Sequence, residues 1–170
     1  MAKISGYNVG VKYKVITNTT PTGNVNSTSN TLISSMLIPA NTFSAGDIVT
    51  IETCVTKSST FNTHTQLFFI NTSPSLLGAI QIATTTGSVG TRAYQLYRRL
   101  AISVSDGTGN GTKTLNSTIN ARDDVGAITY TTGLSTLAIN WKVEQYLIVS
   151  GSVVNIADTI SCQWIKASNG

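Results

Sequence analysis

Apolar and polar residues alternate along much of the chain, which is the period of a β-strand with one buried face. The first run spans residues 9–15, where every second residue from Val9 to Val15 is apolar. A polar, turn-rich segment then occupies residues 17–30. Further apolar or alternating runs cover residues 32–38, 48–55, 66–70, 80–82, 92–104, 112–119, 127–130, 137–149 and 159–166. None of these runs keeps a helical period over ten residues.

The parity of each run predicts which side chains form the core. Residues of one parity dominate 137–149, which predicts a single long strand with a bulge near Glu144 and Gln145. In the last run, Trp164 shares the parity of Ile160 and Cys162. The side chains that we expect to be mostly buried are those of Val49, Ile51, Tyr94, Leu96, Ile102, Ile139, Trp141 and Trp164. Turn signals separate nearly every run, so the pattern indicates an all-β sandwich or barrel.

The composition narrows the possible partners. Only 11% of residues are charged, whereas Thr, Ser and Asn together make up 60 of the 170 residues. The net charge of +4 reflects few acids, and the basic residues are scattered without interleaved aromatics. We therefore expect no nucleic-acid binding. No apolar run is long enough for a membrane span, and no secretion signal is visible, so we expect the protein to be made and folded in a cytosol.

Catalytic and metal-binding chemistry has few candidate residues. His64 is the single imidazole, and no G-x-S-x-G nucleophile motif accompanies it. Asp123 and Asp124 could form a carboxylate pair with Glu52 or Glu144, but most of the seven acids lie in turn contexts. We expect no catalytic residue, no metal site and no cofactor, and hence no enzyme.

One loop motif and the two cysteines could suggest functional sites, but structural roles fit them better. The segment from Asp106 to Gly111 imitates the start of an EF-hand, but the position that needs a Glu is Ser117. A glycine-rich hairpin tip is the simpler interpretation. Cys54 and Cys162 lie in strand-like runs and are expected to be reduced core residues.

Among the aromatic residues, Tyr97, Tyr130 and Tyr146 lie on the opposite parity or in short strands. Exposed aromatic rings can stack on sugars, so these three are the candidates for a glycan-binding platform. Tyr is also common where subunits meet, and burial at a subunit contact is the competing interpretation.

Three segments together resemble a known group of proteins. They are residues 38–49, which contain Ile-Pro-Ala-Asn before Gly-Asp, residues 69–80, and residues 146–161. Their order resembles the jelly-roll domains of bacteriophage appendage proteins, such as head fibres, capsid decoration spikes and tail-fibre tips. Those domains resemble trimers of the tumour-necrosis-factor type, so the resemblance implies an antiparallel jelly-roll β-sandwich and a homotrimer. It implies no catalytic residue.

The resulting expectation is a non-enzymatic structural protein on the surface of a phage virion. Residues 1–30 would be an N-terminal strand and polar attachment arm, and residues 31–170 the jelly-roll domain. The partners would be two further copies, other virion proteins such as the capsid or fibre base, and a host cell-surface glycan. A carbohydrate-binding β-sandwich module is the alternative, and a small β-sandwich hydrolase is a third possibility.

Overall fold

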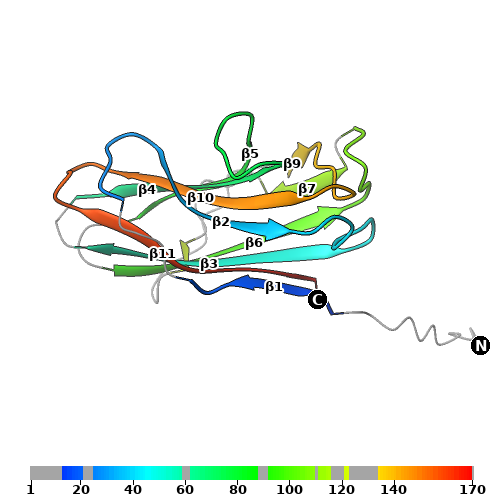
Figure 1. Ribbon diagram of the computed structural model, residues 1–170, viewed down its shortest axis with the longest axis horizontal. Coiled ribbons are helices and arrows are strands. Elements are labelled where there is room, and N and C mark those ends of the chain that lie inside the picture. The colour runs from blue at the N-terminus through cyan, green and yellow to red at the C-terminus, as the bar shows by residue number, and fades with distance from the viewer. Residues whose placement is uncertain are drawn as a thin grey trace, which may run out of the picture.

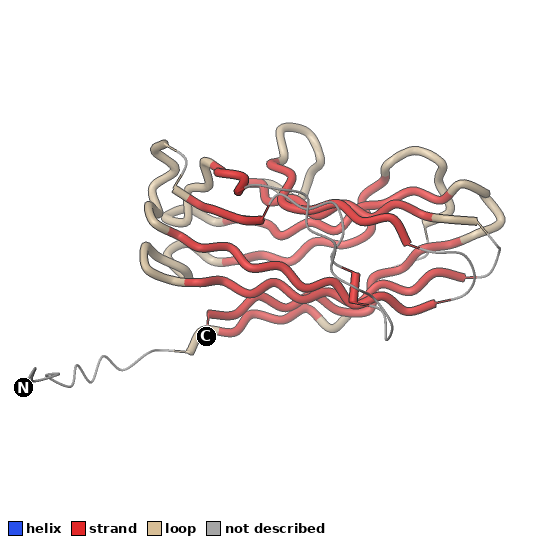
Figure 2. The backbone as a smooth tube through the Cα atoms, turned by 180° about the vertical axis from the view of Figure 1, so that it is seen from behind, coloured by secondary structure: helices blue, strands red, loops and turns tan. Residues whose placement is uncertain are grey.

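Two antiparallel sheets packed face to face make up the structure, which is a computed structural model (Figure 1). It describes residues 13–20, 25–58, 62–87, 92–109, 111–115, 121–122 and 134–169. These residues contain strands, turns and loops but no helix, as Figure 2 shows from behind. The all-β sandwich expected from the alternating pattern is therefore confirmed.

The larger sheet has the strand order β1-β11-β3-β6-β7-β9, and β8 pairs with β6 beside that path. Every pairing in it is antiparallel. Its strands are β1 (Val15–Asn18), β3 (Ile48–Ser58), β6 (Arg92–Ile102), β7 (Thr112–Leu115), β8 (Ala121–Arg122), β9 (Leu134–Leu137) and β11 (Thr159–Asn169).

The smaller sheet has the order β2-β10-β4-β5 and is also antiparallel. Its strands are β2 (Thr31–Ile38), β4 (His64–Asn71), β5 (Ile80–Gly87) and β10 (Gln145–Val153).

The long-range pairings are nested. The first four strands pair in reverse order with later ones: β1 with β11, β2 with β10, β3 with β6, and β4 with β5. A chain folded back on itself in this way and rolled into two layers is compatible with the expected jelly roll.

The core between the sheets follows the predicted parity in most strands. In β3, every second residue from Val49 to Lys57 is buried. The expected burial of Val49, Ile51, Ile102, Ile139 and Trp141 is confirmed, since each is at most 3% exposed. The side chains of Tyr94 and Leu96 lie outside the described part of the chain.

The prediction for Trp164 is wrong. A bulge between Cys162 and Trp164 places one extra residue, Gln163, opposite β3. Such an insertion exchanges the two faces of the strand. Cys162 and Ile165 are consequently buried, while the Trp164 side chain is half-buried on the outer face.

The expected single strand at 137–149 is also wrong. The chain leaves the larger sheet at Leu137, crosses the sandwich, and joins the smaller sheet at Gln145. Trp141 lies at this crossing, where its ring meets Phe43 edge-on at 5.8 Å between centroids. Its Nε1 donates a hydrogen bond to Thr112 Oγ1 at 2.9 Å. Most of the alternate residues of 137–149 are apolar because they face one core, although the run is divided between two strands in different sheets.

The first strand of the described residues begins later in the chain than the alternating pattern predicts. The first strand is Val15–Asn18, which overlaps the segment expected to be a polar arm, and it pairs with the end of β11. Val25 forms an isolated antiparallel bridge with Ile160 and packs against the core. The run at 9–12 and the short strand expected at 127–130 lie outside the described residues.

We predict that Trp141→Ala lowers the free energy of unfolding by about 3–5 kcal/mol, because it leaves a large cavity and orphans the Thr112 hydroxyl. Trp164→Ala is the matched control and should cost about 1 kcal/mol, since that side chain lies partly exposed on the outer face. Urea denaturation followed by circular dichroism measures both values. Equal losses would contradict the assignment of Trp141 to the centre of the core.

Candidate interaction surfaces

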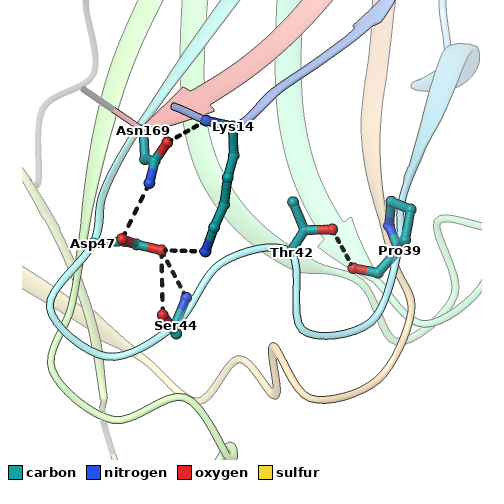
Figure 3. A network of polar contacts seen from close by, with 6 residues as sticks. All are labelled: Lys14, Pro39, Thr42, Ser44, Asp47 and Asn169. Atoms are coloured by element: carbon teal, nitrogen blue, oxygen red, sulfur yellow. Dashed lines mark hydrogen bonds and ion pairs between the residues drawn. The ribbon is translucent and has the colours of Figure 1, made fainter. Parts of the chain in front are cut away.

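The Ile-Pro-Ala-Asn…Gly-Asp motif forms the loop between β2 and β3. Asn41 and Gly46 both adopt a positive φ there, 59° and 96° respectively, which Asn and Gly tolerate better than other residues. Thr42 Oγ1 donates to the Pro39 carbonyl at 2.7 Å and closes the first turn (Figure 3). The motif residues are therefore explained by the loop geometry.

Asp47 connects this loop to both ends of the described chain. Its Oδ2 accepts hydrogen bonds from the Ser44 backbone N–H at 2.9 Å and from Lys14 Nζ at 3.3 Å. Its Oδ1 accepts from Asn169 Nδ2 at 3.2 Å, and Asn169 Oδ1 accepts from the Lys14 backbone N–H (Figure 3). Although partial burial opposes ionisation, these hydrogen bonds and the Lys14 charge hold the pKa of Asp47 below its usual value. This network, the Asp47 clamp, holds the strand ends in place.

The outer face of the larger sheet carries charged and aromatic side chains in cross-strand rows. Lys166 on β11, Glu52 on β3 and Tyr97 on β6 are register neighbours. Lys166 Nζ lies 2.9 Å from Glu52 Oε1, and Trp164 follows in the next row beside Cys54. We call this surface the polar face; it is defined by Glu52, Tyr97, Arg99, Trp164 and Lys166.

Tyr97 and Arg99 form the most exposed part of the polar face. Arg99 Nε and Nη2 donate to the Tyr97 hydroxyl at 3.2 and 3.1 Å, and the guanidinium carbon lies 5.6 Å from the ring centroid. The hydrogen bonds from Arg99 and Thr50 lower the pKa of Tyr97. The ring remains 40% exposed, so a flat aromatic surface and cationic N–H groups are available side by side.

The outer face of the smaller sheet has the opposite character. Ile148 lies in register between Ser35 and Phe69, and its neighbours along β10 are core residues that point inward. Leu32 and Leu37 on β2 are each 38% exposed. We call this surface the apolar face; it is defined by the exposed or partly exposed side chains of Leu32, Leu37, Leu67, Phe69 and Tyr146, together with Ile148, which is itself 0% exposed in the single chain.

Charge distinguishes the two faces sharply. None of the residues of β2, β4, β5 and β10 is Asp, Glu, Lys or Arg. The apolar face is therefore built on strands without an acidic side chain, a lysine or an arginine. Their single titratable basic group is the imidazole of His64, which is buried. Charged residues are depleted at the centres of protein interfaces, whereas a surface that only meets water normally carries them.

The candidates for catalysis are dispersed. His64 is 1% exposed at the start of β4, and burial together with the charge of Lys57 lowers its pKa to about 4, against an opposing effect of Asp158. Glu52 pairs with Lys166, and Glu144 is exposed in the turn before β10. Asp123 and Asp124 lie outside the described residues. Within the described ranges, no carboxylate pair is assembled around His64.

The remaining predicted motifs take structural positions. Asp106 accepts hydrogen bonds from the Thr108 backbone N–H and hydroxyl, and Gly107 and Gly109 adopt positive φ values, as in a tight loop tip. Asn110 and Ser117 lie outside the described part. No group of three or more His, Cys, Asp or Glu side chains that could hold a metal occurs among the residues that the structure describes.

Neither cysteine forms a disulfide, and the two lie on different faces of their sheet. Cys162 is a core residue, and burial raises the pKa of its thiol to about 12. Cys54 is only half-buried and alternates with the inward residues of β3, so the expectation of a core position is wrong for this thiol. Burial raises its pKa as well.

Sequence reasoning located Tyr97 on an exposed parity, and it is exposed. Tyr146 belongs to the apolar face and is half-buried, while Tyr130 lies outside the described residues. The feature that the pattern missed is Arg98, which interrupts the apolar parity of β6 yet faces inward and is 3% exposed. Burial lowers the pKa of this guanidinium.

Comparisons with known proteins add little to this description. No family model and no curated protein matches the chain. The crystal structure of dimeric latent PorU from Porphyromonas gingivalis is similar with a TM-score of 0.44 and 10% identity, over 92% of this chain and 12% of that one. A similarity at that level supports no statement about function. Among the described residues, no helix has the length and apolar character needed to cross a membrane.

We predict that Asp47→Asn lowers the free energy of unfolding by about 1 kcal/mol at neutral pH, because the loop and both strand ends lose a charged acceptor. The pKa of Asp47 is lowered in the folded state, so its contribution is complete above the ordinary value of 3.8. The difference between the two chains should vanish as the pH falls through the folded-state pKa. Glu144→Gln, at an exposed position in the turn before β10, is the control and should leave the free energy of unfolding unchanged at neutral pH. Urea denaturation of the wild type and both variants between pH 2 and 7 measures these differences.

Proposed function

We propose that the protein is a non-enzymatic structural component of a phage virion, a surface appendage that assembles as a homotrimer. The observation that carries the proposal is the uncharged apolar face of the smaller sheet. The nested strand pairing and the loop formed by the Ile-Pro-Ala-Asn motif support the resemblance to phage jelly-roll appendages.

The apolar face supports self-assembly for a physical reason. A sandwich needs one buried face on each sheet, and the core between the sheets already provides it. The outer side of β2, β10 and β4 nevertheless leaves leucine, phenylalanine and tyrosine side chains at least partly exposed, without a compensating charge. Transfer of apolar surface out of water stabilises association by about 25 cal/mol per Å². Three copies packed with these faces around a common axis would bury the surplus.

The polar face would then point away from the axis. Its ion pair and its Tyr97–Arg99 contact are compatible with water, and they are the groups that remain free to contact other molecules. In this arrangement, virion proteins such as the capsid or fibre base hold the trimer on the particle, and the outer surface faces the host cell. The protein acts by binding and not by chemistry.

We predict that Leu37→Lys converts the trimer to monomer at micromolar concentration, because an ammonium group would be buried in the interface. Leu37 is 38% exposed in the single chain, so the substitution should leave the fold intact. Gln95→Lys introduces the same charge at an exposed position of β6 and should remain trimeric. Equilibrium sedimentation, with circular dichroism to check folding, measures the outcome. A wild-type monomer would remove the trimer from the proposal.

The location on the particle is tested independently. Mass spectrometry of purified virions should detect the chain in a ratio to the capsid protein that is constant between preparations. Its absence from particles that are otherwise complete would contradict the assignment to the virion.

A carbohydrate-binding module is the second candidate, and the polar face favours it. Tyr97 offers a ring for stacking on a sugar, and the Arg99 guanidinium beside it can donate to sugar hydroxyls. Trp164 lies two strands away on the same face. This role is also compatible with a virion appendage whose receptor is a host glycan.

We predict that Tyr97→Ala reduces binding to a responsive oligosaccharide at least tenfold, because a stacking partner and the anchor of Arg99 are both lost. Thr86→Ala, at an exposed position of β5, is the control and should bind normally. A glycan array identifies the oligosaccharide, and titration calorimetry measures the affinities. Binding that is unchanged by Tyr97→Ala would exclude the polar face as the sugar site.

A further inference from the structure

A fully buried ion pair lies at one end of the sandwich. Lys57, near the end of β3, extends its Nζ to 3.2 Å from Asp158 Oδ2, and both side chains are 0% exposed. Asp158 immediately precedes β11, the strand that pairs with β3, and Lys57 is in register with Ile160. The two groups therefore project into the core from adjacent strands of one sheet.

The surroundings of the pair are polar but closed to solvent. From the smaller sheet, His64 and Gln66 are each 1% exposed, and their side-chain nitrogens lie 2.8 Å apart. Gly87 is in register with His64, and a Cβ at that position would overlap the imidazole ring. The imidazole interacts electrostatically with both members of the pair, and its lowered pKa keeps it neutral at pH 7. The chain thus holds an ammonium, a carboxylate and a neutral imidazole together in a space closed to solvent.

We propose that Lys57 and Asp158 condense to an intramolecular amide, a covalent cross-link between β3 and the start of β11. The geometry supplies the nucleophile at contact distance from the carboxyl group. Burial supplies the driving force, because two formal charges without water are costly to keep apart from solvent, whereas an amide carries no formal charge. This inference is independent of the proposed virion role.

The reaction balances without an oxidant or a co-reactant. A proton moves from the Lys57 ammonium to the Asp158 carboxylate, which leaves a neutral amine beside a carboxylic acid. The amine nitrogen then attacks Cγ, a C–N bond forms, and one C–O bond breaks. The departing oxygen leaves as water with two hydrogens, both of them originally on Nζ. The third hydrogen stays on the amide nitrogen.

The experiment is the intact mass of the purified, denatured full chain. We expect it to be lower than the sequence mass by one water molecule. Trypsin should fail to cleave after Lys57, because an acylated lysine is no longer a cation, and the digest should contain a branched peptide that joins Lys57 to Asp158. A mass equal to that of the sequence, together with cleavage after Lys57, would overturn the proposal.

Two controls separate the cross-link from folding and from proximity alone. Lys57→Met combined with Asp158→Leu removes both charges at similar volume, so it should fold and show its full sequence mass. The pair of Lys166 and Glu52 is closer, at 2.9 Å, but its side chains are 30% and 20% exposed. That pair should remain unlinked in the wild-type digest. A water loss that persists in the double variant would assign the reaction to another site and refute this one.

Discussion

The packing of the two sheets depends on Trp141, which lies in one of the segments where the chain crosses between them. Trp141 fills the core at that point, its ring meets Phe43 from the β2–β3 loop, and its N–H is satisfied by Thr112 on β7. One side chain therefore connects the crossing segment, the loop that contains the Asp47 clamp, and the end of the larger sheet. A large aromatic residue suits this role because it offers area for packing and a single donor that must find a partner. The separation of the polar and apolar faces follows from the sandwich that this contact holds together.

Most strands could be predicted from the sequence because their burial is locally periodic. The alternation from Val49 to Val55 is visible in the sequence and present in the structure. The predictions fail at two kinds of position. An inserted residue changes which face of the sheet the following side chains occupy, and a change of sheet divides one alternating run between two strands. Gln163 reverses the faces of β11, and the crossing at Trp141 places Leu137 and Val149 in different sheets without changing their parity. Periodicity records burial, but it contains no information about which strand lies next to which.

The candidate surfaces were harder to predict for the same reason. Glu52 and Lys166 are 114 residues apart, and only the pairing of β3 with β11 brings them together. Lys57 and Asp158 likewise meet only because those strands are neighbours. The exposed parity of Tyr97 was a local signal and was read correctly. The lack of charge in β2, β4, β5 and β10 was visible in the sequence, but it describes a surface only once these four strands are known to form one sheet.

The antiparallel pairing of β1 with β11 also determines how the domain responds to force. Val15 lies opposite Ser168, so the first and last described strands begin and end at the same point of the sheet edge. A tension applied between these two ends acts perpendicular to the strands, so the hydrogen bonds between β1 and β11 break one after another. A tension between the N-terminal end and the opposite end of the sandwich would instead shear all of them at once. Under the first loading, the direct hydrogen bonds between Lys14 and Asn169 and the contacts of Asp47 with both residues are the first to carry the strain.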